Sequence, residues 1–283
     1  MSPLDYCQTE HAPRGTTLYY SLHFLKPKHK NALLPVFAFT KTIQNIPNTK
    51  EPEIAKTQLH WWLNEIQNIN NPTHPITQAL KPIIQKYELP LELFQEHIQG
   101  ILQTMHYQAY HHFSDLVQHA HRLTYAPSQL NAKILGVEDK ETSIFLHQCG
   151  LALTLCELIW TLRNDALRGY VYFPTEDLSR FDLTATSILD EQNQGSVKNL
   201  LNFEAHRARE IYQAALQELP KQSRYELHPY LIQAAISFKL LDEIEKDGFQ
   251  VFKHQIALKP ITKAWIAWKT HRREKHKAVP QRG

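Results

Sequence analysis

The sequence predicts an all-α fold, because glycine is scarce, apolar residues recur at helical spacing, and prolines separate the helical stretches. Only 8 of the 283 residues are glycine, and long helices tolerate few glycines because each costs backbone entropy. Hydrophobic residues make up 42% of the chain, which is enough to form a large core. We therefore expect a single domain over residues 1–283, in which residues 274–283 form a flexible basic tail.

Helical periodicity extends over most of the chain. Many boundaries coincide with prolines, since a fixed φ and a missing N–H suit the first turn of a helix. Pro35 and Pro82 are expected in first turns or at kinks. The predicted helices cover residues 18–34, 36–46, 52–70, 74–87, 91–111, 114–135, 140–167, 197–219, 224–247 and 260–274.

The segment from Arg168 to Pro174 interrupts this pattern. Its sequence, Arg-Gly-Tyr-Val-Tyr-Phe-Pro, is typical of a short extended piece after a long helix. Thr175 is expected to cap the next helix, and residues 187–194 are expected to form a loop.

Composition narrows the class of protein. A net charge of +3 is too small by itself to indicate nucleic-acid binding. Three cysteines without CxxC spacing fit a reducing compartment and argue against a disulfide framework or a zinc site. The polar N-terminus lacks a signal-peptide pattern, and Glu157 interrupts the longest apolar stretch, 150–162. We expect a cytoplasmic protein, peripheral on the inner face of a membrane.

The C-terminal stretch 263–277 combines Trp265 and Trp268 with a run of Lys and Arg. Trp favours the membrane interface and basic residues favour anionic lipid, so this stretch is a candidate membrane-contact surface. The alternative is a helix whose tryptophans pack in the core, followed by a frayed end. The pair Trp61 and Trp62 is expected in the core.

Histidines are concentrated in the middle of the chain. Imidazole binds Zn²⁺, but the chain has 17 His, so some clustering is expected. We interpret these residues as solvated or helix-capping, and we expect no metal site. The clustered residues are His106, His111, His112, His119 and His121.

Several local strings occur in an order that is informative as a set. They are Asp5–Gln8, Leu18–Ser21, Leu59–Trp62, His74–Thr77, Asp165–Pro174, Arg207–Glu210 and Leu241–Phe249. In this order they resemble the squalene/phytoene synthase family, and within it bacterial presqualene-diphosphate synthase, over essentially the whole chain.

This resemblance implies an isoprenoid-synthase helical fold around a central apolar cavity. Enzymes of the family join two prenyl diphosphates head to head, and two aspartate-rich helices bind the Mg²⁺ that carries the diphosphates. Ionising a diphosphate requires positive charge near the leaving group. The resemblance places ligand-binding positions at Tyr19, Tyr20, Ser21, Lys41, Trp160, Arg168 and Ser237.

The first metal-binding motif of the family has lost its acids here. The family motif reads Arg-x-x-Asp-Asp-x-x-Asp, whereas this chain has Lys41 followed by amides at Gln44, Asn45 and Asn48. Mg²⁺ prefers anionic oxygen ligands, and Lys lacks the planar fork that Arg offers a phosphate.

The second motif is also degenerate. The family pattern Asn-x-x-Arg-Asp-x-x-x-Asp matches Glu157, Trp160, Thr161 and Asp165, so one aspartate remains. Glu157 and Asp165 are eight residues apart, about 12 Å along a helix, which is too far to chelate one Mg²⁺ together. A shifted register through Arg163 would imitate part of the motif but breaks its spacing to the Arg-Gly that follows.

Charge is absent at two further positions that face the cavity in the family. The run after Gly100, residues 101–106, contains no acid, and a late tyrosine of the family is replaced by Ser237. Losses on separate helices indicate that diphosphate chemistry has been removed from the cavity as a whole. A cavity filled by Trp160 would favour a scaffold that acts only through its surface, and an open one would favour lipid binding.

The sequence therefore favours a non-catalytic protein that binds an isoprenoid or another lipid, or that assists assembly of a membrane complex. A mitochondrial branch of the family that lacks the aspartate pairs assists assembly of respiratory complex I, which supplies a precedent. The alternative is an active, Mg²⁺-dependent prenyltransferase that condenses farnesyl or geranylgeranyl diphosphate in squalene, hopanoid or carotenoid biosynthesis. The expected partners are a lipid, a membrane surface and a protein, but no nucleic acid.

Overall fold

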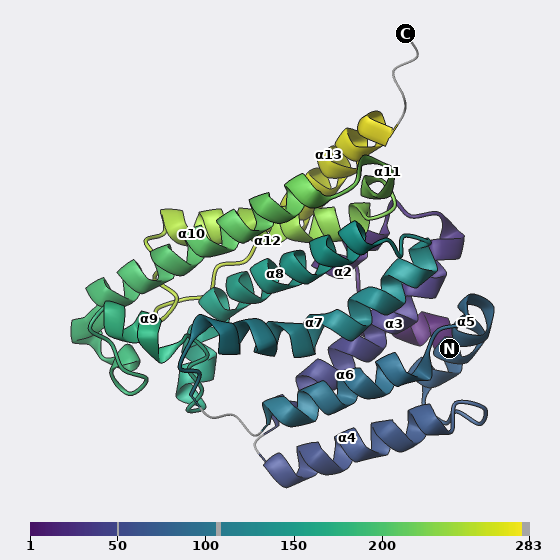
Figure 1. Cartoon of the computed structure of the whole chain (residues 1–283), viewed down its shortest axis with the longest axis horizontal. Coiled ribbons are helices and arrows are strands. Elements are labelled where there is room, and N and C mark those ends of the chain that lie inside the picture. The colour runs from purple at the N-terminus through teal and green to yellow at the C-terminus, as the bar shows by residue number, and fades with distance from the viewer. Residues whose placement is uncertain (50, 106–108, 279–283) are drawn as a thin grey trace.

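The computed structural model describes residues 1–49, 51–105 and 109–278, and within these ranges it contains α-helices and short 3-10 turns but no β-strand (Figure 1). The all-α prediction is confirmed. The helices are α1 (Pro3–His11), α2 (Thr17–Leu22), α3 (Pro27–Asn45), α4 (Pro52–Gln67), α5 (Pro75–Tyr87), α6 (Leu91–Thr104), α7 (Phe113–Leu135), α8 (Lys140–Leu167), α9 (Thr175–Arg180), α10 (Gln194–Glu218), α11 (Lys221–Arg224), α12 (His228–Lys246) and α13 (Pro260–Ala278), and the 3-10 turns are η1 (Ile46–Asn48), η2 (Ser187–Leu189) and η3 (Glu191–Asn193).

Helix α8 lies at the centre of the molecule and packs against α7, α10 and α12 (Figure 1). It contains no proline, so its hydrogen-bond ladder is uninterrupted. Its first half contributes Phe145 and Cys149 to a hydrophobic core shared with α3 and α6, and its second half contributes Leu155 and Ile159 to a core shared with α10. The same helix therefore joins both cores.

Among the described residues, α8 is also the one helix that is long and apolar enough to cross a membrane by length and composition. However, 61% of its most apolar window is buried inside the protein. This burial identifies α8 as a core helix, whose neighbours satisfy its apolar surface.

A glycine allows α7 and α8 to pack closely. A Cβ atom added at Gly150 of α8 would lie 2.6 Å from Oγ1 and 2.8 Å from Cβ of Thr124 on α7. Atoms without a mutual hydrogen bond do not approach that closely without displacement. Gly150 is thus a packing residue that sets the separation of these two helices.

The predicted boundary between the first two long helices was wrong. The break falls before Pro27, which occupies the first turn of α3, and α3 then continues through Pro35. Proline fits a first turn because the N–H it lacks would have no partner there. Within α3, Pro35 removes one hydrogen bond, but its ring lies in the core at this position, and packing keeps the helix continuous.

Three other boundaries differ from the predictions. Helix α6 ends at Thr104 and not at residue 111, and the helix predicted from residue 224 begins at His228, after the separate short helix α11. Helix α1 was not predicted, although Ser2 and Asp5 form a capping box at its start. Short helices carry too few periodic residues for a periodicity search to detect.

The segment after α8, residues 168–174, is irregular, and α8 ends before it as predicted. Gly169 has φ = +86°, a left-handed conformation that suits glycine, and it directs the chain away from α8. The residue that precedes α9 is Pro174, so the predicted cap at Thr175 was wrong by one position. Instead, the Thr175 N–H donates to the Tyr110 carbonyl at 2.8 Å.

The two adjacent tryptophans of α4 have different environments. Trp62 is 5% exposed, as predicted, whereas Trp61 is 44% exposed, so its predicted core position was wrong. Consecutive helical residues differ by about 100° around the axis, and only one of the two side chains reaches the core.

Two arginines of α10 anchor neighbouring segments through ion pairs. Arg207 makes a bidentate pair with Asp177 of α9, at 2.8 and 3.0 Å, and also contacts Glu204. Burial raises the pKa of Glu204 to about 8, against the opposing charge of Arg207. Arg209 binds Asp242 of α12 at 2.8 Å. Two of the segments that resemble the family, 207–210 and 241–249, therefore contain side chains whose ion pairs link α10 to α9 and α12.

We expect Gly150→Ala to lower the free energy of unfolding by about 1–3 kcal/mol, because the new methyl group overlaps Thr124. Helix propensity alone would favour alanine, so the sign of the change isolates the packing effect. Urea unfolding measures it. The matched control is Gly195→Ala in α10, where an added Cβ meets nothing within 4 Å. Equal stability changes in the two variants would contradict the role of Gly150.

Candidate functional site

Gln44 stands where the first motif of the family has its first aspartate. Its side chain donates a hydrogen bond. Its Nε2 lies 2.8 Å from the carbonyl oxygen of Leu123 in α7. In a regular helix that carbonyl would accept the N–H of residue 127, but residue 127 is Pro127, which has none. The Gln44 amide therefore satisfies a carbonyl that proline leaves without its helical partner. A carboxylate, which only accepts hydrogen bonds, has no donor for this contact.

The remaining positions of the first motif lie at the end of α3 and in η1. Asn45 is exposed in the last turn of α3. The Oδ1 of Asn48 accepts a hydrogen bond from Arg168 at 2.6 Å, and the other Arg168 nitrogen donates to Asp165 at 2.5 Å. One guanidinium thus joins the first motif to the single retained aspartate of the second. We call Asn48, Asp165 and Arg168 the arginine clamp.

The other polar positions of the second motif, Glu157 and Thr161, lie one turn apart on α8. Thr161 donates to the backbone carbonyl of Glu157 at 2.9 Å, which occupies its hydroxyl proton within α8. The Glu157 side chain reaches solvent, yet burial, followed by the charge of Asp165, raises its pKa, and Lys41 opposes the rise.

Trp160 and Thr161 line a pocket of about 380 Å³. Its other walls come from α12 and from the segment between α12 and α13. Trp160 is half-buried and forms one wall of this space without filling it. The volume lies in the range of ligand pockets, and such pockets combine apolar walls with a few polar groups. The remaining lining residues are Leu240, Ile244, Gln250, Val251, His254, Gln255 and Ile256.

The predicted ligand-binding positions on α2 and α12 are not among the residues that line this pocket. Tyr20 packs beside a small core of α12 and α13 that includes Ile236 and Ile266, and Ser21 is fully buried, with its hydroxyl on the Leu18 carbonyl at 2.9 Å. Tyr19 contacts Tyr20 edge-on, with ring centroids 5.2 Å apart.

Ser237 is half-buried on α12. It shares a helical face with Tyr230, seven residues earlier. The Tyr230 hydroxyl accepts a hydrogen bond from Asn131 of α7 at 2.9 Å, and its ring lies 6.3 Å from that of Phe37 in α3. Tyr230 therefore links α12 to α3 and α7 two turns before Ser237.

The donor groups do not fit a Mg²⁺ cluster. Mg²⁺ requires near-octahedral oxygen ligands, usually including carboxylates, whereas the amide of Gln44 and the carboxylate of Asp165 are already bound to protein groups. In the described ranges 1–49, 51–105 and 109–278, no three His, Cys, Asp or Glu side chains gather where they could hold a metal. The side chains at these positions therefore do not fit such a cluster.

The clustered histidines take separate partners. His112 contacts Glu176 at 2.9 Å, and His119 is buried against Tyr110, with its Nδ1 2.9 Å from the tyrosine hydroxyl. His121 pairs with His147 of α8 at 3.4 Å. His111 is exposed, and His106 lies outside the described residues.

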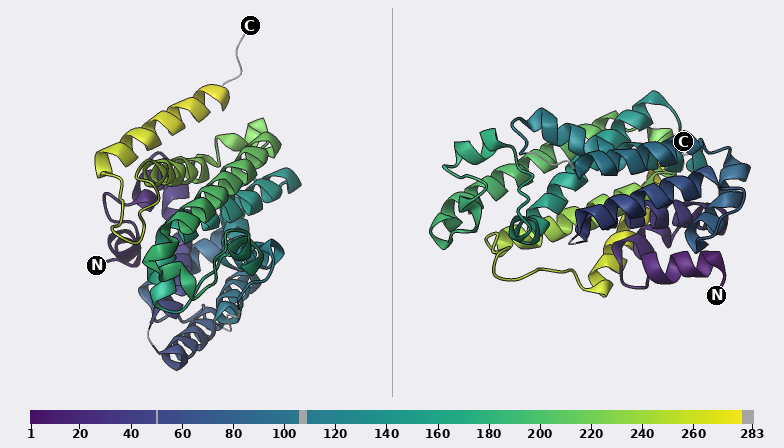
Figure 2. Two further views of the ribbon diagram at one scale, coloured as in Figure 1. Left: turned by 90° about the vertical axis from the view of Figure 1, so that its left-hand side faces the viewer. Right: turned by 90° about the horizontal axis from the view of Figure 1, so that it is seen from below.

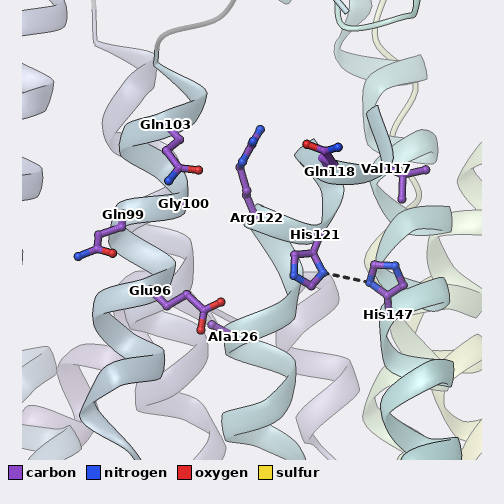
Figure 3. Close-up of a pocket in the computed structure, with 10 residues that line it drawn as sticks. All are labelled: Glu96, Gln99, Gly100, Gln103, Val117, Gln118, His121, Arg122, Ala126 and His147. Carbon is purple, nitrogen blue, oxygen red and sulfur yellow. Dashed lines mark hydrogen bonds between the residues drawn. The ribbon is translucent and has the colours of Figure 1, made fainter. Parts of the chain in front are cut away.

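A second pocket, of about 490 Å³, lies over α7 between α6 and α8, and sequence analysis did not identify it (Figure 3). Gln99 and Gln103 of α6 line one side, and the His121–His147 pair lines the other (Figure 3). These residues come from separate helices and form no continuous motif, so only the packing of the helices brings them together.

We expect Gln44→Glu to lower the free energy of unfolding by about 1–3 kcal/mol, because it leaves the Leu123 carbonyl without a donor. Gln44→Leu should destabilise through the same loss. The informative control is Pro127→Ala, which restores a backbone N–H to that carbonyl. Gln44→Leu should then cost less in the Pro127→Ala background than in the wild type, as a urea-unfolding double-mutant cycle would measure. Identical costs in both backgrounds would contradict the pairing.

Three buried histidines predict a loss of stability in acid. Burial lowers the pKa of His97, His119 and His228 to about 4 each, below the ordinary value of 6.5. Between these values the unfolded chain binds protons that the folded chain does not, so stability is retained above pH 6.5 and falls as pH drops toward 4. The slope should approach about 1.4 kcal/mol per pH unit for each histidine. Urea unfolding between pH 6.5 and pH 4 measures this loss of stability. An equal free energy of unfolding at the two pH values would contradict the prediction.

Comparison with known proteins agrees with this architecture. The family model for squalene/phytoene synthase matches residues 12–262. The phytoene synthase of Mycobacterium tuberculosis is 26% identical over 254 residues, covering 88% of this chain and 84% of that protein. The 15-cis-phytoene synthase of Synechocystis is 21% identical over 268 residues, covering 89% of this chain and 79% of that protein.

Solved structures share the fold. A dehydrosqualene synthase in complex with a ligand superposes with a TM-score of 0.83 at 15% identity, covering 97% of each chain. A squalene synthase from Alicyclobacillus acidocaldarius gives a TM-score of 0.74 at 18% identity, covering 87% of this chain and 94% of that one. Both are similar in the arrangement of the helices across nearly the full length. Given the family match over residues 12–262, the chain belongs to the squalene/phytoene synthase family.

Proposed function

We propose that this protein binds an isoprenoid or another lipid on the squalene/phytoene synthase scaffold without ionising a diphosphate. The observation that carries the proposal is the Gln44–Leu123 hydrogen bond. Where the family motif has a metal-binding acid, this chain uses a donor to complete the backbone of α7. The amide is therefore part of the packing between α3 and α7, and a carboxylate there would lose the contact.

The arginine clamp supports the same proposal. A carboxylate that ligates Mg²⁺ needs free oxygen lone pairs and a negative charge. Arg168 neutralises Asp165 and simultaneously binds Asn48. The guanidinium thus lies between the two motifs and carries a permanent positive charge. This charge disfavours binding of a divalent cation at the same place.

The pocket beside Trp160 supplies space for an apolar ligand. Five of its nine lining residues are apolar, and Thr161, Gln250, His254 and Gln255 supply polar groups. An isoprenoid chain gains free energy by leaving water for such a surface. The family relationship and the ligand-bound structural relative favour a lipid over a small polar metabolite. The protein would then carry or sense a lipid, or present it during assembly of a membrane complex, at the cytoplasmic face of the membrane.

The enzyme alternative is supported by the relatives. The matched proteins from Mycobacterium and Synechocystis are phytoene synthases, and Asp165 is retained. In that case Mg²⁺ would have to be held by Asp165 and by groups of the substrate itself, and the two prenyl diphosphates would be condensed head to head. The arginine clamp would have to open to release the carboxylate.

Pyrophosphate release separates the two functions. With farnesyl or geranylgeranyl diphosphate and Mg²⁺, the protein should release no more pyrophosphate than a protein-free control, while a phytoene synthase assayed in parallel should release it. Release above the control that disappears in Asp165→Ala would overturn the proposal and establish the enzyme alternative.

Lipid extraction and mass spectrometry of protein purified from its native host test the binding function. We expect an isoprenoid or another lipid at close to one molecule per chain. Leu240→Trp, which fills the pocket, should abolish its retention. The matched control is Leu167→Trp. Leu167 is the last residue of α8, is 61% exposed and does not line the pocket. Lipid-free wild-type protein, or equal retention in both variants, would contradict this site.

A further inference from the structure

Helix α13 presents an unusual surface that neither pocket explains. It lies at the periphery of the molecule and is covered on one side only (Figure 2). Ile261 is 74% exposed, Trp265 56% and Trp268 47%, so three large apolar side chains face solvent on one helix. The sequence leaves open whether these tryptophans pack in the core, and their exposure excludes that alternative.

The exposed side chains form one continuous stripe. Ile261, Trp265, Trp268, Arg272 and Lys275 are spaced by four, three, four and three residues, so they share one face of the helix. The first half of this face is apolar and the second half is basic. We call these five residues the α13 stripe.

The opposite face of α13 holds the helix firmly on the protein. Ile266 and Ala267 pack into a small core with Ile232 and Ile236 of α12. His271 stacks on Phe24, with ring centroids 4.7 Å apart and an interplanar angle of 13°. The α13 stripe is therefore presented at a fixed orientation, and it need not fold when it binds a partner.

Charge on the exposed face has a single sign. The one acid of α13, Glu274, is fully buried, where it binds Arg224 at 2.8 Å and Arg273 at 2.7 Å. Lys269 and Arg272 lie over the rings of Trp265 and Trp268, 4.9 and 5.4 Å from their centroids. The cations are thus placed immediately beside the apolar groups. The helix carries six basic residues, namely Lys263, Lys269, Arg272, Arg273, Lys275 and Lys277.

We propose that the α13 stripe docks the protein onto a membrane surface rich in anionic lipid. Trp partitions to the level of the headgroups, and each Lys or Arg near an anionic surface strengthens binding roughly fivefold. A rigid helix with apolar and basic groups on one face lies in the interface plane. The inference does not depend on the proposed function, because the stripe lies outside both pockets and binds whether or not the protein is catalytic.

The exposed apolar side chains of α4 provide an internal comparison. Ile54 is 45% and Trp61 44% exposed, which is similar exposure to that of the tryptophans of α13. However, the start of α4 carries the exposed acids Glu51 and Glu53, which an anionic surface repels. The two exposed patches therefore differ in charge and not in apolar character, and only the α13 stripe fits an anionic lipid surface.

Vesicle co-sedimentation of the full chain tests the proposal. We expect binding to vesicles of phosphatidylcholine mixed with phosphatidylglycerol, weak binding to pure phosphatidylcholine, and loss of binding at about 1 M salt, where the screening length is about 3 Å. Tryptophan fluorescence should shift to the blue on binding. Trp265→Ser with Trp268→Ser should weaken binding on the order of tenfold or more, and Arg272→Glu with Lys275→Glu by at least about 25-fold.

The matched control is Trp61→Ser, which removes an equally exposed tryptophan from α4 and should leave vesicle binding unchanged. Thermal unfolding of each variant checks that these exposed substitutions preserve the fold. Equal binding to neutral and anionic vesicles would overturn the proposal, as would stripe variants that bind like the wild type. Binding to single-stranded RNA but not to vesicles, lost in the same variants, would overturn it in favour of a nucleic-acid surface.

Discussion

The burial of α8 is the constraint on which the rest of the structure depends. This helix joins the two hydrophobic cores and contacts α7, α10 and α12, so its position fixes theirs. Gly150 allows α7 to approach closely, and that approach in turn places the Leu123 carbonyl within reach of Gln44 on α3. The second metal motif of the family lies on the same helix. Its side chains are therefore positioned by a helix that packs into both of these cores.

The positions of the lost acids have acquired hydrogen-bonding roles of their own. Pro127 leaves a carbonyl without its helical partner, and Gln44 satisfies it. Arg168 draws Asn48 and Asp165 together in the arginine clamp. Meanwhile Arg207 and Arg209, in strings that resemble the family, fasten α9 and α12 to α10. The groups that hold the scaffold together are present, whereas the groups that would hold diphosphate have been replaced by donors and amides. This contrast is the basis of the proposed lipid-binding function.

The prediction from sequence succeeded where long helices carry strong periodicity and failed where a local choice depended on distant contacts. The bounds of α8 follow from an apolar run that ends before Gly169. Pro27 and Pro35 look equivalent in the sequence, yet only Pro27 begins a helix, because the surroundings of Pro35 are core. Trp61 and Trp62 are likewise equivalent by composition, and the direction of the core separates them. The pocket over α7 could not be predicted, since its lining residues come from three helices without a shared motif.

The sequence by itself determined the all-α fold, the family resemblance and the absence of acids from the metal motifs, because helical periodicity and residue identity are local properties. It also placed tryptophans beside basic residues near the C-terminus. Only the tertiary structure decided that Gln44 bonds to α7, that Arg168 spans both motifs, that Trp160 lines a pocket without filling it, and that Trp265 and Trp268 face solvent. Each of these depends on which surfaces the packed helices bury. Burial is set by groups far apart along the chain and near one another only after folding.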